Sequence, residues 1–69
     1  MNIKLKFGKK IKEIRLKKGL SQEALANLAD IDRTYLPSIE KGETNVSIVI
    51  AEKLATALNV ELKDLFTKY

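Results

Sequence analysis

The chain has 69 residues, with 13 Lys and Arg against 9 Asp and Glu, and it contains neither His nor Cys. A chain of this length buries only about 60% of the surface that it exposes when unfolded, so we expect one compact domain and no separate effector domain. The absence of His and Cys excludes disulfides, zinc fingers and thiol nucleophiles, and we expect no metal and no cofactor. No apolar run approaches the roughly 20 residues of a membrane span, and residues 1–6 do not resemble a signal peptide, so we expect a cytoplasmic protein with no membrane association.

Positive charge is concentrated at the N-terminal end of the chain. Residues 1–20 contain eight bases and one acid, a net charge of +7, whereas residues 21–69 have a net charge of −3. Such a stretch is typical either of a solvated helix face or of a surface that attracts a polyanion, and the composition leaves both interpretations open.

The first predicted helix covers residues 4–18. Its inward side chains are predicted from apolar residues at spacings of three and four, Phe7, Ile11 and Ile14. Gly19 is predicted to end this helix, because glycine readily adopts the left-handed backbone found at helix C-termini.

The next two predicted helices are short and are joined by a tight turn. Ser21 is predicted to cap a helix over residues 21–29, and Asp30 begins the turn. Asp32 is predicted to cap a third helix that ends at Gly42. The inward apolar side chains of these two helices are predicted to be Ala24, Leu25, Leu28, Ala29, Leu36 and Ile39.

Two further helices complete the predicted fold, which contains no strand. Ser47 is predicted to cap a fourth helix that ends at Asn59, and a fifth helical segment covers residues 62–67. The inward side chains of the fourth helix are predicted to be Ile50, Leu54, Ala55 and Leu58. Five short helices with a turn of about three residues between the second and third indicate an all-α helix-turn-helix domain, although periodicity alone leaves other small helical bundles open.

Four segments of the sequence carry a family resemblance. They are Leu20–Ala26 (LSQEALA), Ile31–Leu36 (IDRTYL), Ile39–Gly42 (IEKG) and Asn45–Ser47 (NVS). Together they resemble the λ repressor/Cro-type (XRE) helix-turn-helix family, and within it most resemble the controller proteins of restriction–modification systems. The resemblance implies a five-helix λ repressor-like domain over residues 1–69. It further implies a transcriptional regulator that binds a palindromic double-stranded DNA operator as a homodimer, with no small-molecule effector.

The resemblance also implies base contacts from the start of the third helix. Arg33 and Thr34 match the family positions that contact base edges, and Ser38 lies one turn further on the same exposed face. Arginine can donate two parallel hydrogen bonds to guanine, and threonine offers a hydroxyl and a methyl group. For Tyr35 two positions remain open, packing beneath the third helix or contact with DNA, and the resemblance favours contact with DNA.

Five other residues match family positions with backbone or structural roles. Gln22, Lys41 and Asn45 match positions that contact DNA phosphates. Arg15 and Glu40 match a partly buried ion pair that joins the first helix to the third.

The sequence departs from the family pattern at three places. Pro37 lies at the fifth position of the predicted third helix, where proline removes a backbone hydrogen bond and can kink the helix. Asp30 replaces the usual turn glycine, a tolerable change because aspartate adopts the left-handed region more readily than most residues. Glu43 and Thr44 stand where many controllers carry a basic residue, so a DNA contact there is expected to be missing.

The C-terminal segment is predicted to form the dimer interface, because one short helix cannot bury all of its apolar residues. Leu65 is assigned to the core. The residues assigned to the partner are Val60, Leu62, Phe66 and Tyr69.

Other functions remain open from the sequence alone. They are an antitoxin-like interaction protein whose main partner is a toxin polypeptide, a generic phage-type repressor of the same family, and a basic helix over residues 3–18 that binds membrane surfaces. Enzymatic activity is not expected, because the sequence has no nucleophile–base pairing and no phosphate-cradling loop.

Overall fold

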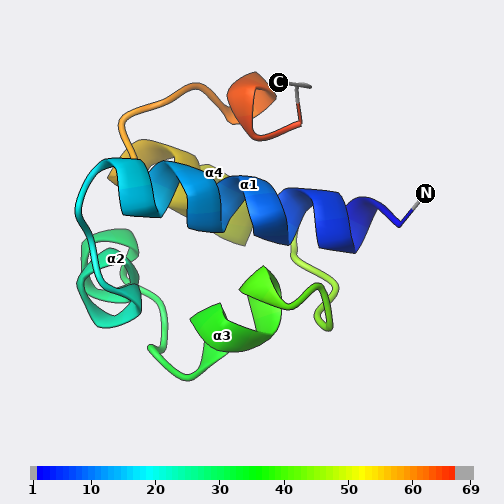
Figure 1. The fold of residues 1–69 in the computed structure, drawn as a ribbon, viewed down its shortest axis with the longest axis horizontal. Coiled ribbons are helices and arrows are strands. Elements are labelled where there is room, and N and C mark those ends of the chain that lie inside the picture. The colour runs from blue at the N-terminus through cyan, green and yellow to red at the C-terminus, as the bar shows by residue number, and fades with distance from the viewer. Residues whose placement is uncertain (1, 67–69) are drawn as a thin grey trace.

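A computed structural model describes residues 2–66, and in these residues it contains four α-helices, one 3₁₀ helix and no strand (Figure 1). The elements are α1 (Ile3–Lys17), α2 (Gln22–Ala29), α3 (Tyr35–Glu40), α4 (Ile48–Ala57) and the 3₁₀ helix η1 (Leu62–Leu65). The predicted all-α helix-turn-helix fold is confirmed. The predicted fifth helical segment is present as η1, which is a single turn of 3₁₀ helix and not a fifth α-helix, and its predicted end at residue 67 lies outside the described residues. None of the described helices is long and apolar enough to cross a membrane.

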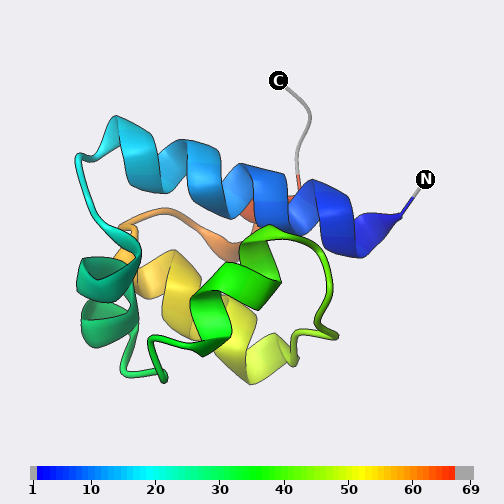
Figure 2. The same cartoon turned by 60° about the horizontal axis from the view of Figure 1, so that its bottom comes forward.

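The helices enclose one apolar core. The long α1 lies across the molecule and contacts α3 and η1, while α2 packs against α3 and α4 (Figures 1 and 2). The buried apolar side chains of the core are Phe7, Ile11, Leu25, Ala29, Leu36, Ile39, Ala51, Leu54, Ala55, Leu58 and Leu65. Leu65 therefore lies in the core as predicted.

Local hydrogen bonds set most helix ends where the sequence predicts them. The Ser21 hydroxyl accepts a hydrogen bond from the Ala24 backbone N–H at 3.0 Å, and the Ser47 hydroxyl accepts one from Ile50 at 3.1 Å. Asp30 ends α2 in the left-handed region, with φ of 57°. Both predicted serine caps and the predicted aspartate turn are confirmed.

The start of α3 differs from the prediction. Asp32 Oδ1 accepts hydrogen bonds of 2.9 Å from the Thr34 backbone N–H and hydroxyl, so it holds a turn before the helix, and α3 begins only at Tyr35. Pro37 is consequently the third residue of α3. A backbone N–H in the first turn has no partner inside the helix, so proline removes no helical hydrogen bond here. The predicted loss of a helical hydrogen bond at Pro37 is therefore wrong, because α3 begins later than the sequence indicates.

One inward assignment is also wrong. Leu28 is 61% exposed, whereas Ala26 is buried. Ile50 is half-buried and packs against the core, in agreement with its inward assignment. Leu28 and Ala26 lie on opposite sides of the line between Leu25 and Ala29 on α2, and the rest of the fold covers only the side of Ala26. Periodicity places the centre of an apolar stripe but does not tell which of its edges is covered.

Candidate nucleic-acid interface

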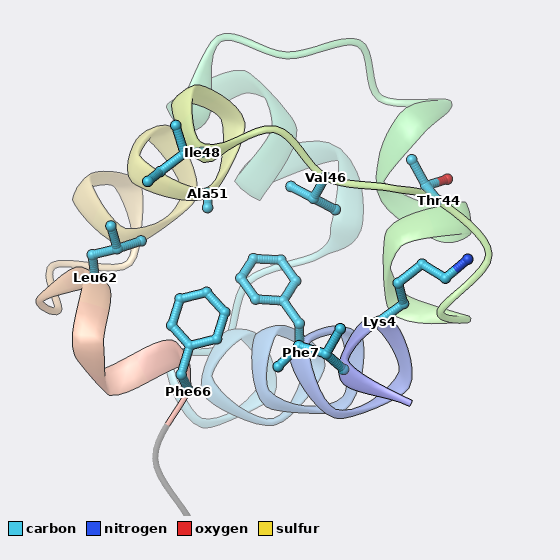
Figure 3. A pocket seen from close by; sticks show the side chains of 9 residues that line it. Lys4, Phe7, Thr44, Val46, Ile48, Ala51, Leu62 and Phe66 are labelled. Atoms are coloured by element: carbon cyan, nitrogen blue, oxygen red, sulfur yellow. The ribbon is translucent and has the colours of Figure 1, made fainter. Parts of the chain in front are cut away.

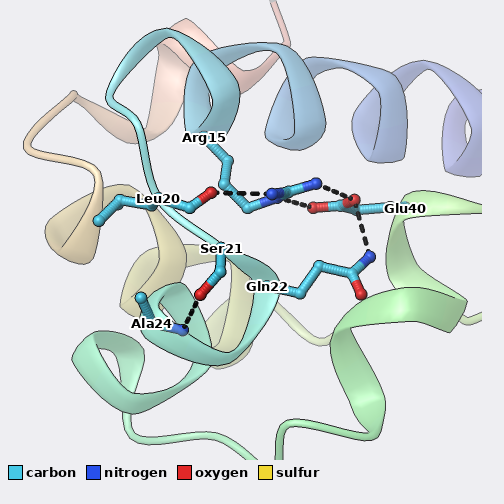
Figure 4. A network of polar contacts seen from close by, with 6 residues as sticks. All are labelled: Arg15, Leu20, Ser21, Gln22, Ala24 and Glu40. Carbon is cyan, nitrogen blue, oxygen red and sulfur yellow. Dashed lines mark hydrogen bonds and ion pairs between the residues drawn. The ribbon is translucent and has the colours of Figure 1, made fainter.

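A buried ion pair joins α1 to the end of α3 (Figure 4). Arg15 Nε and Nη2 donate hydrogen bonds to the two carboxylate oxygens of Glu40, at 2.7 and 3.1 Å. The two side chains are only 9% and 4% exposed. Arg15 Nη1 also donates to the carbonyl of Leu20 at 2.8 Å, just before α2. One guanidinium thus ties together α1, the end of α3 and the segment that leads into α2.

Gln22, the first residue of α2, extends this network. Its Nε2 donates a hydrogen bond to Glu40 Oε1 at 3.1 Å (Figure 4). The Glu40 carboxylate therefore accepts hydrogen bonds from two other helices. Because side-chain amide and guanidinium groups satisfy it, the buried carboxylate does not carry an uncompensated charge.

The residues that precede α3 are exposed and polar. Arg33 Nη1 donates to Glu23 Oε2 on α2 at 3.0 Å, and the two side chains are 69% and 62% exposed. The backbone N–H and the hydroxyl of Thr34, which both donate to Asp32, lower the pKa of that carboxyl below its ordinary value of 3.8. Arg33 and Thr34 thus project from an ordered turn at the entrance to α3.

Two of the predicted base-contacting side chains are engaged within the fold. The Tyr35 ring is half-buried and packs against the core. Of the two positions left open for Tyr35, the ring therefore takes the packed one. Ser38 is half-buried, and its hydroxyl donates to the Tyr35 carbonyl at 2.9 Å and lies 2.6 Å from the Thr44 hydroxyl. Their contacts with DNA remain predictions, and they start from less exposed positions than Arg33 and Thr34.

The loop after α3 presents two further predicted residues. Lys41 and Asn45 are both exposed. Between them Gly42 has a φ of +76° and packs so closely on Leu5 of α1 that an added Cβ would lie 2.5 Å from its side chain. The Thr44 hydroxyl is hydrogen-bonded to that of Ser38. The loop is therefore held by contacts with both α1 and α3.

The turn before α3, α3 itself and the loop after it lie on one side of the molecule (Figure 2). We name these segments, together with Gln22, which hydrogen-bonds to Glu40 at the end of α3, the α3 face, and define it by the predicted DNA-contacting residues Gln22, Arg33, Thr34, Ser38, Lys41 and Asn45. Two partners of these residues were not predicted from the sequence, Glu23 and Thr44. Nothing in the sequence indicates either partner, because Glu23 is ten residues from Arg33 and Thr44 is six residues from Ser38.

An apolar groove lies between α1, the loop before α4, the start of α4 and η1 (Figure 3). Its volume is about 230 Å³, and it is lined by Ile3, Lys4, Phe7, Thr44, Val46, Ile48, Ala51, Leu62 and Phe66. The rings of Phe7 and Phe66 meet in it with their centroids 5.4 Å apart. Large apolar side chains on its rim remain accessible, with Ile48 74% and Phe66 50% exposed.

Only part of the predicted dimer surface lies in this apolar groove. Leu62 and Phe66 line it, whereas Val60 is half-buried and does not. Tyr69 lies outside the described residues. The sequence did not indicate Ile48, because the groove is formed by elements that lie far apart in the chain.

Known proteins resemble this chain over nearly its whole length. The model of a helix-turn-helix family matches residues 11–65. Control protein C.MunI from Mycoplasma sp is 48% identical over 67 residues, which cover 96% of this chain and 90% of the relative. The crystal structure of the restriction-modification controller protein C.AhdI from Aeromonas hydrophila superimposes with a TM-score of 0.89 at 51% identity, covering 91% of this chain and 96% of that protein. SinR, the master regulator for biofilm formation, solved in complex with DNA, has a TM-score of 0.83 at 39% identity, covering 88% of this chain and 98% of that one.

Proposed function

The chain belongs to this helix-turn-helix family, and from that membership we propose that it is a transcriptional regulator that binds a palindromic DNA operator as a homodimer. Its similarity to control protein C.MunI and to the restriction-modification controller protein C.AhdI supports a controller-like role. The observation that carries the proposal is the α3 face, where Arg33 and Thr34 project from the entrance of a helix that the Arg15–Glu40 pair fixes to the fold.

Base recognition is assigned to the start of α3. The Arg33 guanidinium has five N–H donors and gives one of them to Glu23, so four remain, and guanine needs two of these for its pair of parallel hydrogen bonds. Thr34 donates its hydroxyl to Asp32 but leaves its methyl group and an acceptor lone pair exposed. Tyr35 and Ser38 are assigned secondary base contacts.

Phosphate contacts are assigned to the edges of the α3 face. Lys41 and Asn45 occupy the held loop after α3, and Gln22 occupies the start of α2. Such contacts set the position of a protein on the duplex and supply affinity that does not depend on sequence. No enzymatic step is assigned to the domain.

The apolar groove is assigned to the dimer. Its exposed rim, which includes Ile48 and Phe66, is the kind of apolar surface that a soluble protein covers with a partner. A second copy related by a two-fold axis would place the same surface against itself. The two copies of α3 would then enter successive major grooves about 34 Å apart on one face of the duplex.

Selection of bound fragments from a pool of random duplexes tests this function. We expect enrichment of an inverted repeat whose half-sites are centred about one DNA turn apart. Enrichment of a single unrepeated half-site would contradict the dimer, and a pool that stays random would contradict sequence-specific binding.

A further inference from the structure

We propose that Glu23 is a positioning residue that strengthens the sequence preference of Arg33 by holding its guanidinium at the entrance to α3. The proposal rests on the proposed DNA-binding function and assigns a role to a residue that contacts no base itself. The observation that carries it is the 3.0 Å contact between Glu23 Oε2 and Arg33 Nη1, which joins α2 to the turn before α3.

The chemistry of the pair leaves Arg33 able to recognise a base while it is held. The contact takes one N–H of Nη1, and the guanidinium keeps its other four donors. Asp32, the acid that directly precedes Arg33 in the sequence, accepts two hydrogen bonds from Thr34. Glu23 is therefore the carboxylate that the structure places in hydrogen-bond contact with Arg33.

Holding the side chain favours the operator over other sequences. Arginine loses rotamer freedom when it docks on a base, and a side chain already confined by an ion pair loses less. This gain applies only where Arg33 finds its guanine. The negative charge of Glu23, by contrast, repels the phosphates of every duplex alike, so it weakens binding to all sequences.

Only the holding of Arg33 raises the ratio of operator affinity to random-DNA affinity, because a repulsion that is equal for every duplex cancels in that ratio. The size of the effect is limited, because both side chains are mostly exposed and an exposed ion pair is weak. We expect Glu23→Gln to increase affinity for random DNA and to lower the affinity ratio about threefold, within the range of an exposed ion pair.

A double-mutant cycle tests the proposal on the selected operator and on a scrambled duplex of the same composition. The four proteins are the wild type, Glu23→Gln, Arg33→Ala and the double variant. We expect Glu23→Gln to lower the affinity ratio in the wild-type background and to leave it unchanged in the Arg33→Ala background. Thermal melting without DNA should differ little between Glu23→Gln and the wild type, because the exposed pair contributes little to stability.

Two further variants separate the ion pair from charge alone. Glu52→Gln removes the same charge from an exposed position on α4, outside the helix-turn-helix, and should leave the affinity ratio unchanged. Glu23→Asp keeps the charge but shortens the side chain by one methylene, and we expect it to lower the ratio by part of the Glu23→Gln effect.

Each result bears on a specific claim. An affinity ratio insensitive to Glu23→Gln, or lowered equally with and without Arg33, would overturn the role of Glu23 and leave the proposed function intact. A wild-type protein that binds operator and scrambled duplex equally would overturn both.

Discussion

Gly8 of α1 lies directly against the backbone of Ile39 at the end of α3. A Cβ added at Gly8 would lie 2.2 Å from the Ile39 carbonyl oxygen and 2.9 Å from that of Glu40. Both are backbone atoms, so no side-chain rotation can make room. Gly8 and the Arg15–Glu40 pair, seven residues further along α1, together set how closely α3 approaches α1.

Gly8→Ala is therefore expected to destabilise the protein. Crowding in a packed region typically costs about 1–3 kcal/mol, and it outweighs the gain of up to about 1 kcal/mol that alanine brings to a helix interior. Urea unfolding measures the loss. The exposed neighbour Lys9 offers a control, since Lys9→Ala should stay within about 0.5 kcal/mol of the wild type. Equal midpoints for Gly8→Ala and the wild type would show that α3 can move away freely.

Glu40→Ala should destabilise the protein far more than the loss of an exposed acid. It leaves the buried Arg15 guanidinium without its carboxylate, a change that typically costs about 3–5 kcal/mol. Glu23→Ala, which removes one partner of an exposed pair, should cost no more than about 1 kcal/mol. Thermal melting without DNA compares them, and similar melting temperatures for the two variants would mean that burial of the Arg15–Glu40 pair adds nothing.

Arg33→Ala and Lys41→Ala should produce different kinds of defect. Arg33→Ala is expected to cost about 1–3 kcal/mol on the operator and little on random DNA. Lys41→Ala should weaken binding to both and make log K less dependent on log salt, because one fewer phosphate is neutralised in each subunit. Titration of both duplexes at two salt concentrations distinguishes them. An equal loss of affinity on both duplexes for Arg33→Ala would show that Arg33 contacts the phosphate backbone rather than a base.

Ile48→Asp should dissociate the dimer without harming the fold. Ile48 is 74% exposed on the rim of the apolar groove, and as the first residue of α4 it occupies a position where an acid suits the helix dipole. Sedimentation should show the mass of one chain. Leu28→Asp, at an equally large exposed apolar residue on α2 that does not line the groove, should leave the mass unchanged. A dimer that survives Ile48→Asp would place the interface elsewhere.

The turn that leads into α3 should weaken in acid. The pKa of Asp32 is lowered because the carboxylate accepts two hydrogen bonds from Thr34, so its stabilising contribution is complete above the ordinary value of 3.8 and is lost as the pH falls through the lowered value. Asp32→Asn keeps an acceptor but does not titrate. We expect the difference in free energy of unfolding between the wild type and this variant to shrink as the pH falls below 3.8, as followed by urea unfolding. A difference that stays constant with pH would show that Asp32 does not contribute to the loss of stability in acid.

The sequence by itself determined the features that depend on neighbours within about four residues. Ser21 and Ser47 cap helices, and Gly19 and Asp30 end them in the left-handed region, because each of these preferences is local. Apolar periodicity likewise determined the number of helical segments and most of the core. The motifs that carry the family resemblance are equally local, which is why the family could be recognised from the residues alone.

The tertiary structure decided which side chains meet across the chain. Leu28 is exposed and Ala26 buried because α3 and α4 cover only one edge of the α2 stripe. Ile48 joins Phe66 in one groove, and Glu23 meets Arg33, through contacts between separate elements. Periodicity predicts which face of a helix is apolar but not which element packs against that face, since the covering residues lie far away in the sequence. The α3 face and the apolar groove therefore became defined only when the helices packed together.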